Sequence, residues 1–226
     1  MRTGAIVAGG RSTRFGDTDK SVAPLAGVPM VRRVANRLAG DDDPIPPGAD
    51  RASGGDPVVD ELVVNCRPDQ RAAIATALDD ARLPIRWSLD DETDQGPMAG
   101  IRNACRAARG EYAFVVACDM PFVDPAFVSH LFAEATGHDA AVPQLADRWY
   151  QTTQAVYNAD AMGDACDRAL ARGDRKILDP LSELEYAVVG DDAIRERTTE
   201  RTFANVNTRE ELDDTEAFIR SALSPT

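Results

Sequence analysis

Residues 5–20 read AIVAGGRSTRFGDTDK, and the architecture of the chain follows from this segment. Its apolar start belongs to a short buried strand, expected over residues 3–8, which runs directly into Gly9 and Gly10. Glycines at this point let backbone N–H groups approach a phosphate without a Cβ in the way. Because ligands of open α/β sheets bind beyond the carboxyl ends of the strands, we expect an anion site directly after this strand.

The polar part of the segment supplies the other groups that a triphosphate needs. Ser12 offers a hydroxyl donor, and Arg14 and Lys20 offer positive charge that offsets the charge of the phosphates. Val7 and Ala8, at the end of the strand, are included in the expected nucleotide site. The segment matches neither of the two best-known phosphate loops, because it lacks both the GxxxxGK[ST] and the GxGxxG spacing.

Strand and helix patterns alternate along the rest of the first half of the chain. This rhythm predicts an α/β fold, with a doubly wound, mostly parallel sheet that carries helices on both faces in a Rossmann-like arrangement. The expected strands cover residues 58–65, 85–89 and 112–117, and the expected helices follow Pro29 and Gly96 or cover residues 69–78 and 124–135.

We expect residues 1–226 to form a single domain, because a chain of this length suits one hydrophobic core. Residues 40–57 are rich in Asp, Pro and Gly and have no apolar period, so they are predicted to be a surface loop insertion. The second half is expected to contain strand-like stretches at 140–144, 151–157 and 203–206 and helices at 160–172, 177–184 and 208–223.

The composition limits the partners of the protein. The net charge is −13, which argues against nucleic acid and anionic membranes, since both bind basic surfaces. No apolar run approaches the ~20 residues of a membrane span. Lys20 and Lys176 are the only lysines. We therefore expect either adaptation to concentrated salt, where charge repulsion is screened, or an ordinary acidic protein from an arginine-favouring genome.

The four cysteines form no CxxC pair, and the two histidines are not clustered with them, so a zinc site is not expected. The chain begins with a short apolar strand that runs into glycines and not with a signal peptide. These features predict a reduced cytoplasmic protein.

Two carboxylates follow predicted strands. Asp119 comes just after the strand at 112–117, and Asp90 comes just after the strand at 85–89. Both should lie at the same edge of the sheet as the glycine turn. A carboxylate at that edge can hold a hard cation that bridges phosphate oxygens.

The chain resembles the molybdenum cofactor guanylyltransferase family, the MobA type, whose signature loop usually reads LAGGxSxRMGxxDK. The resemblance covers nearly the whole chain, and further motifs follow in the order of the family. These motifs are LAGVPM at residues 25–30, VVN at 63–65, GPMAGI at 96–101, ACDMPFV at 117–123 and NVNTREEL at 205–212.

The resemblance implies roles for several residues. Asp119 is implied to be a Mg²⁺ ligand, and an aspartate shortly before GPMAG is implied to contact the nucleotide or the metal. Asp90 is our choice for that role and Asp91 is the alternative. Asn65 and Gly96 are expected at the nucleotide, and catalysis is expected to rest on Lys20, Arg14 and Asp119.

The resemblance also implies the substrates. GTP is favoured, because related cytidylyltransferases carry Ala-Gly where this chain has Gly9 and Gly10. Residues 1–135 are expected to be the nucleotide-binding half and residues 136–226 the acceptor-binding half. In the second half, Asn205 and Asn207 match a turn of the family near the metal and the cofactor, and Arg175, beside Lys176, is a candidate contact for the phosphate of the pterin.

The resulting hypothesis is a Mg²⁺-dependent nucleotidyltransferase that transfers GMP from GTP to molybdopterin or the molybdenum cofactor and releases pyrophosphate. Cofactor-insertion proteins and molybdoenzymes are the expected protein partners. One alternative is guanylyl or cytidylyl transfer to another phosphorylated acceptor, such as a cobamide precursor or a sugar phosphate. Another is a catalytically silent GTP-binding module.

Overall fold

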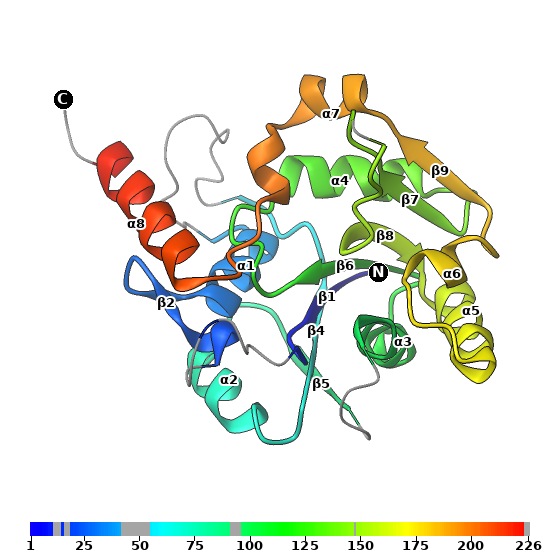
Figure 1. The fold of residues 1–226 in the computed structure, drawn as a ribbon, viewed down its shortest axis with the longest axis horizontal. Helices are drawn as coiled ribbons and strands as arrows, with labels where there is room; N and C mark the ends of the chain where they lie inside the picture. Colours follow the sequence, from blue (N-terminus) through cyan, green and yellow to red (C-terminus); the bar gives the residue numbers. More distant parts are fainter. Residues whose placement is uncertain (11–14, 16–18, 42–54, 91–95, 147, 224–226) are drawn as a thin grey trace.

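A seven-stranded sheet runs through the centre of the computed structural model, which describes residues 1–10, 15, 19–41, 55–90, 96–146 and 148–223 (Figure 1). The strand order in this part of the chain is β5-β4-β1-β6-β8-β7-β9. All neighbouring strands are parallel except for β8, which runs antiparallel to both β6 and β7. The strands are β1 (Arg2–Val7), β4 (Glu61–Cys66), β5 (Ile85–Leu89), β6 (Tyr112–Ala117), β7 (Ala140–Pro143), β8 (Gln154–Asn158) and β9 (Tyr186–Val189).

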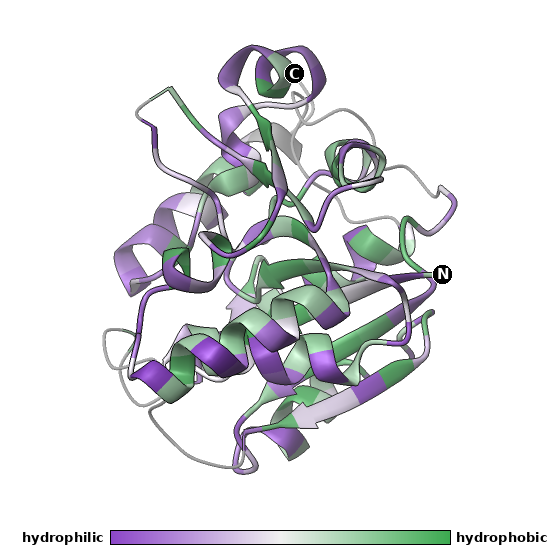
Figure 2. Cartoon of the chain, turned by 90° about the vertical axis from the view of Figure 1, so that its right-hand side faces the viewer, coloured by the Kyte–Doolittle hydropathy of each residue, from purple (hydrophilic) through white to green (hydrophobic). Residues whose placement is uncertain are grey.

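Helices cover both faces of the sheet, so the predicted doubly wound architecture is confirmed (Figures 1 and 2). One face carries α3 (Pro97–Ala107) and α5 (Ala159–Arg172), with the short α6 (Leu178–Leu181) packed on α5. The other face carries α1 (Met30–Ala39), α2 (Arg71–Ala77), α4 (Pro125–Glu134) and α7 (Asp191–Arg197).

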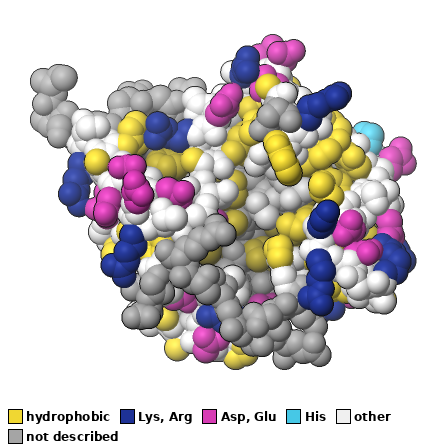
Figure 3. All heavy atoms as spheres, viewed as in Figure 1, with side chains coloured by type: hydrophobic (Ala, Val, Ile, Leu, Met, Phe, Trp, Pro, Cys, Tyr) yellow, Lys and Arg dark blue, Asp and Glu magenta, His cyan; other side chains and the backbone are white. Residues whose placement is uncertain are grey.

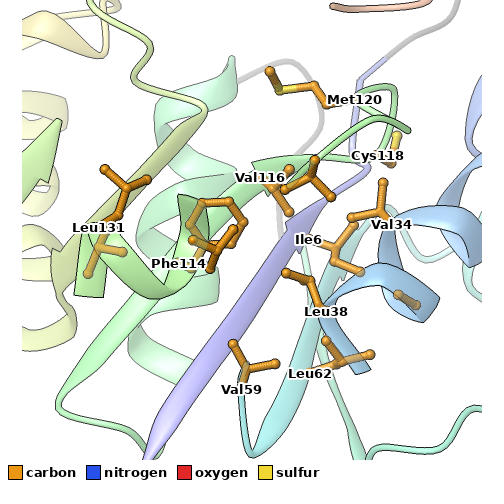
Figure 4. Packing of buried hydrophobic residues seen from close by; sticks show 14 of the residues in the cluster. Ile6, Val34, Leu38, Val59, Leu62, Phe114, Val116, Cys118, Met120 and Leu131 are labelled. Atoms are coloured by element: carbon orange, nitrogen blue, oxygen red, sulfur yellow. The ribbon is translucent and has the colours of Figure 1, made fainter. Parts of the chain in front are cut away.

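The alternation of side chains along β1 shows why both faces are covered. Ala5 packs with the cluster under α3 and α5, and the next residue, Ile6, packs with the cluster under α1 and α4. Figure 4 shows Ile6 against Val34 and Leu38 of α1 in the second cluster. Successive residues of a strand point to opposite faces, so a strand that is apolar at consecutive positions must be buried on both sides.

A smaller cluster lies beyond the sheet. It joins the hairpin of β2 (Pro24–Leu25) and β3 (Val28–Pro29) to α8 (Arg209–Leu223), with Phe15 and Ile219 among its buried residues. The last helix of the chain is thereby brought next to the segment that follows β1.

The expected elements agree with the structure in most places but not all. The strand expected at residues 203–206 is wrong, because the 3₁₀ turn η2 (Glu200–Phe203) occupies its start. Val206 then donates its N–H to the carbonyl of Asp119 at 2.9 Å, so this segment crosses the end of the sheet and does not join it. The helix expected at 177–184 is reduced to α6, and β9 and α7 were not anticipated.

The ends of the predicted insertion at 40–57 meet. The N–H of Gly55 donates to the carbonyl of Gly40 at 2.8 Å, and Arg82 donates to the carbonyls of Ala39 and Gly55. Residues 42–54 lie outside the described part of the chain. Among the described helices, none has the length and apolar character that crossing a bilayer requires.

Charged side chains of both signs are spread over the face seen in Figure 3, and hydrophobic side chains gather in its upper right part. Of the exposed large apolar residues, Trp149 is 68% and Val188 47% accessible.

Candidate nucleotide site

The glycine turn and Asp119 leave the sheet at the same edge. Strands β1 and β6 are parallel neighbours in which Val7 pairs with Ala117, and the N–H of Cys118 donates to the carbonyl of Val7 at 3.1 Å. Both strands therefore end at the same level. The structure thus confirms that the glycine turn and Asp119 lie at the same edge of the sheet.

A cavity of about 320 Å³ opens at this edge. Glycine backbone, three aspartates and one lysine lie in its wall, together with part of α3. The predicted residues in its lining are Val7, Ala8, Gly9, Gly10, Lys20, Asn65, Asp90, Gly96 and Asp119.

Lys20 joins the two halves of the chain at this site. It lies in the 3₁₀ turn η1 (Lys20–Val22), and its ammonium group contacts Oδ2 of Asp119 and lies 3.1 Å from Oδ1 of Asn207. Asn207 is placed by the start of α8, where its N–H donates to Oε2 of Glu211 at 2.5 Å. The predicted residues Lys20, Asp119 and Asn207 thus form one contact group.

Asp119 is the best candidate for holding a cation. The residue is only 8% exposed, and its second oxygen, Oδ1, is buried without a hydrogen-bond partner in the described structure. A buried unpartnered carboxylate oxygen is costly unless a ligand satisfies it. Among the described residues, no group of three or more His, Cys, Asp or Glu side chains is arranged to hold a metal ion by itself. A single carboxylate such as that of Asp119 suits Mg²⁺, which commonly takes one or two carboxylates together with substrate phosphates.

Asp90 also lies in the wall of the cavity and is held there by two amide donors. Its Oδ1 accepts hydrogen bonds from Nδ2 of Asn65 at 2.8 Å and from Nδ2 of Asn103 at 3.2 Å. Its Oδ2 lies beside Gly9, where an added Cβ would come within 2.4 Å of that oxygen. Gly100 is constrained in the same way, because a Cβ there would lie 2.6 Å from Oδ1 of Asn65. These glycines allow the carboxylate and the amide to approach the backbone.

The remaining predicted residues are not part of the described lining of this cavity. Ser12, Arg14 and Asp91 lie outside the described residues. Asn205 and Arg175 are exposed and do not line the cavity.

Several residues at the site were missed by the sequence analysis. Arg67 and Gln70 donate to backbone carbonyls of the glycine turn, Asp19 caps the turn that carries Lys20, and Asn103 holds Asp90. A weak signal existed for two of them, because Arg67 and Gln70 lie in the short segment that follows the VVN motif and Cys66 at the end of a strand.

Cys118 lines the cavity but is not suited to nucleophilic chemistry. Burial, with a smaller contribution from Asp119, raises the pKa of its thiol above the usual range. The thiol is therefore protonated at neutral pH, and a thiolate is the form that attacks.

The chain is similar to proteins of known family over most of its length. The family model described as the MobA-like NTP transferase domain matches residues 4–185. A probable molybdenum cofactor guanylyltransferase of Natronomonas pharaonis is 45% identical over 94% of this chain and 95% of its own length. A protein of the same description from Haloferax mediterranei is 37% identical over 93% of this chain and 91% of its own length.

Solved structures show the same similarity. The crystal structure of molybdopterin-guanine dinucleotide biosynthesis protein A from Archaeoglobus fulgidus superposes with a TM-score of 0.73 at 26% identity. The superposition covers 98% of this chain and 100% of that chain.

Proposed function

We propose, because this chain belongs to the MobA-like NTP transferase family, that it transfers GMP from GTP to the terminal phosphate of molybdopterin or the molybdenum cofactor. The products are the guanine dinucleotide form of the cofactor and pyrophosphate. The observation that carries the proposal is that the glycine turn, Lys20 and Asp119 line the same cavity.

The reaction needs neutralisation of charge more than covalent participation of the protein. A phosphate oxygen of the acceptor attacks the α-phosphorus of GTP, and the bond from that phosphorus to the bridging oxygen breaks as pyrophosphate leaves with the electron pair. Both reactants are anionic, and each like-charge pair at ~4 Å costs about 4 kcal/mol at an effective dielectric constant near 20. In this proposal Lys20 offsets part of that repulsion, as Arg14 does from the same segment, and the glycine turn orients the phosphates.

Mg²⁺ is the proposed metal, and Asp119 is the residue that would hold it. The buried, unpartnered Oδ1 supports this assignment. When bound, Mg²⁺ would neutralise charge on the phosphate oxygens. Lys20 already contacts the other oxygen, Oδ2, and so keeps the carboxylate oriented with Oδ1 available.

Guanine selectivity is proposed to depend on the wall formed by Gly9 and Asp90. A carboxylate oxygen accepts hydrogen bonds, and guanine carries an amino donor on its base that is absent from adenine at the same position. Asp90 is held by two amides on Oδ1, which supports a fixed orientation of Oδ2. Gly96, at the start of α3, is proposed to line the same subsite.

The acceptor is proposed to approach from the side of the second half of the chain. Asn207 reaches Lys20 from that half, which supports its role near the transferred phosphate. Asn205 and Arg175 are exposed and stay as candidate contacts for the acceptor.

We further propose that the enzyme works in the cytoplasm and in concentrated salt, and that cofactor-insertion proteins or molybdoenzymes receive its product. The net charge of −13 with only two lysines supports the salt dependence. The four cysteines are free and buried, which supports a reducing compartment.

The test is a pyrophosphate-release assay with GTP, Mg²⁺ and molybdopterin at molar KCl. We expect release with GTP and much less with CTP or ATP. Release with a sugar phosphate or a cobamide precursor in place of molybdopterin would indicate another acceptor. Tight GTP binding without release under any condition would indicate a binding module.

A further inference from the structure

Three consecutive carbonyl oxygens of the glycine turn are bound by two side chains of one neighbouring turn. Nη1 of Arg67 donates to the carbonyl of Gly9 at 3.1 Å and to that of Gly10 at 2.8 Å. Nε2 of Gln70 donates to the carbonyl of Ala8 at 3.0 Å. Both donors lie between the end of β4 and the start of α2, so this turn holds the backbone that follows β1.

These contacts orient the amides of the glycine turn. A trans peptide directs its C=O and its N–H to opposite sides of the chain. With the carbonyls of Ala8 and Gly9 bound to Gln70 and Arg67, the N–H groups of Gly9 and Gly10 must point away from those side chains. Glycines impose little conformational preference of their own, so an external contact is needed to hold the amides in one orientation.

Gln70 also contacts Asp19, the residue before Lys20. Its Nε2 donates to Oδ2 of Asp19 at 2.8 Å. The other oxygen of Asp19 accepts hydrogen bonds from the N–H of Ser21 at 3.0 Å and from its hydroxyl at 2.8 Å. Asp19 thereby caps the 3₁₀ turn that carries Lys20. The buried side-chain amide of Gln70 therefore connects the glycine turn to the turn that carries Lys20.

The two side chains are themselves fixed in place. The guanidinium of Arg67 contacts the carboxylate of Asp69 through Nε and Nη2, each at 3.1 Å. The backbone N–H of Arg67 donates to Oε1 of Gln70 at 3.0 Å, and Gln70 is only 3% exposed. The turn of residues 67–70 is therefore braced by hydrogen bonds before any ligand binds.

We propose that Arg67 and Gln70 are positioning residues for the triphosphate. They set the spacing and direction of the glycine amides and of Lys20. Because these groups contact phosphates in the proposed function, a nucleotide with more phosphates gains more binding affinity from this arrangement. The inference rests on the proposed function, since it assumes that GTP occupies the cavity.

The experiment measures the dissociation constants of GMP and GTP, with Mg²⁺, for the full chain and for Arg67→Ala. We expect Arg67→Ala to weaken GTP binding by about 10- to 100-fold, the range typical of losing hydrogen bonds from a charged donor. GMP binding should change by less than about 3-fold, so the preference for GTP over GMP should collapse. A general structural defect would weaken both nucleotides alike.

Two further variants make the result specific. Arg71→Ala removes the same charge from the start of α2, where Arg71 stacks on Trp87 and touches no residue of the glycine turn in the described contacts, so it should keep the wild-type preference. Arg67→Lys keeps the charge but not the planar fork, and it should fall between the wild type and Arg67→Ala. Melting temperatures and circular dichroism check that all variants are folded.

The outcomes separate the two proposals. If Arg67→Ala weakens GMP and GTP equally, or neither, the positioning role is wrong. If the wild-type protein binds GTP no better than GMP, the cavity does not recognise the triphosphate. The proposed function is then wrong, whatever the variants show.

Discussion

Single residues at the candidate site are placed so that small changes have large effects. Asp119 combines one oxygen bound to Lys20 with one that is buried and unpartnered. Gly9 lies so close to Asp90 that a single methyl group would collide with the carboxylate. Both features follow from backbone placement at the ends of adjacent or nearby strands, and both can be tested by isosteric or single-atom substitutions.

Asp119→Asn removes the negative charge and keeps the shape of the side chain. We expect kcat to fall by ~10²-fold or more, about 2.7 kcal/mol in the activation free energy, because the amide is a poor metal ligand. Pyrophosphate release across a Mg²⁺ titration is the measurement. Asp160→Asn, an exposed position in the first turn of α5, is the matched control and should leave kcat unchanged. Near-normal turnover of Asp119→Asn would remove the metal assignment.

Gly9→Ala tests the base-recognition wall. The new Cβ would lie 2.4 Å from Oδ2 of Asp90, so the carboxylate has to move. We expect kcat/KM for GTP to fall by about 10-fold or more, roughly the loss of one hydrogen bond to a charged group, with a smaller loss for CTP.

The control for this substitution is Gly190→Ala, where φ is −75° and no atom lies within 4 Å of an added Cβ. It should leave both nucleotides unaffected. Equal losses for GTP and CTP in Gly9→Ala would mean that the residue supports binding without selecting the base.

At the scale of elements, the described wall of the cavity is built from the ends of neighbouring strands and from the turns that follow them. The ends of β1, β4, β5 and β6, together with η1, the turn between β4 and α2 and the start of α3, surround the cavity. The two ends of the insertion after α1 are joined by the hydrogen bond between Gly55 and Gly40 and are braced by Arg82. The insertion therefore closes on itself at its base.

Replacing residues 42–54 with a short Gly-Ser linker should leave activity within about 2-fold of the wild type and shift Tm by only a few degrees. The entropy of closing a loop grows slowly with its length, and the base contacts of Gly40 and Gly55 are retained. Steady-state kinetics and a thermal melt are the measurements. An inactive but folded deletion variant would show that the insertion takes part in the reaction.

At the scale of the whole molecule, the large negative net charge affects the stability of the folded chain. With 38 acidic and 25 basic residues, the folded chain carries a net charge of −13, and repulsion among carboxylates opposes the compact state. Salt screens that repulsion, because the Debye length falls from ~10 Å at 0.1 M to ~3 Å at 1 M ionic strength.

We therefore expect Tm to rise when KCl is increased from 0.1 to 2 M, with most of the gain below about 1 M, where the Debye length changes most. Differential scanning calorimetry measures this, and sorbitol at equal osmolality is the uncharged control. A Tm that does not depend on KCl would contradict salt adaptation and favour the ordinary acidic protein.

Local sequence patterns were enough to predict the features that depend on one strand and the turn after it. The strands at 85–89 and 112–117 were predicted with the bounds that the structure has. The second is an apolar run, YAFVVA, and the first is a short segment, IRWSL, between Pro84 and the acidic residues that begin at Asp90. The meeting of Gly9 and Asp119 also followed, since parallel neighbouring strands end at a common edge.

Only the tertiary structure revealed the features that depend on partners far apart in the sequence. The antiparallel insertion of β8 between β6 and β7, the edge strand β9 and the crossing of Val206 over Asp119 depend on packing between distant elements. The same holds for Arg67, Gln70 and Asn103, whose polar side chains look like ordinary surface residues in the sequence. Their roles arise from hydrogen bonds to backbone and carboxylate groups that approach them only after the sheet has formed.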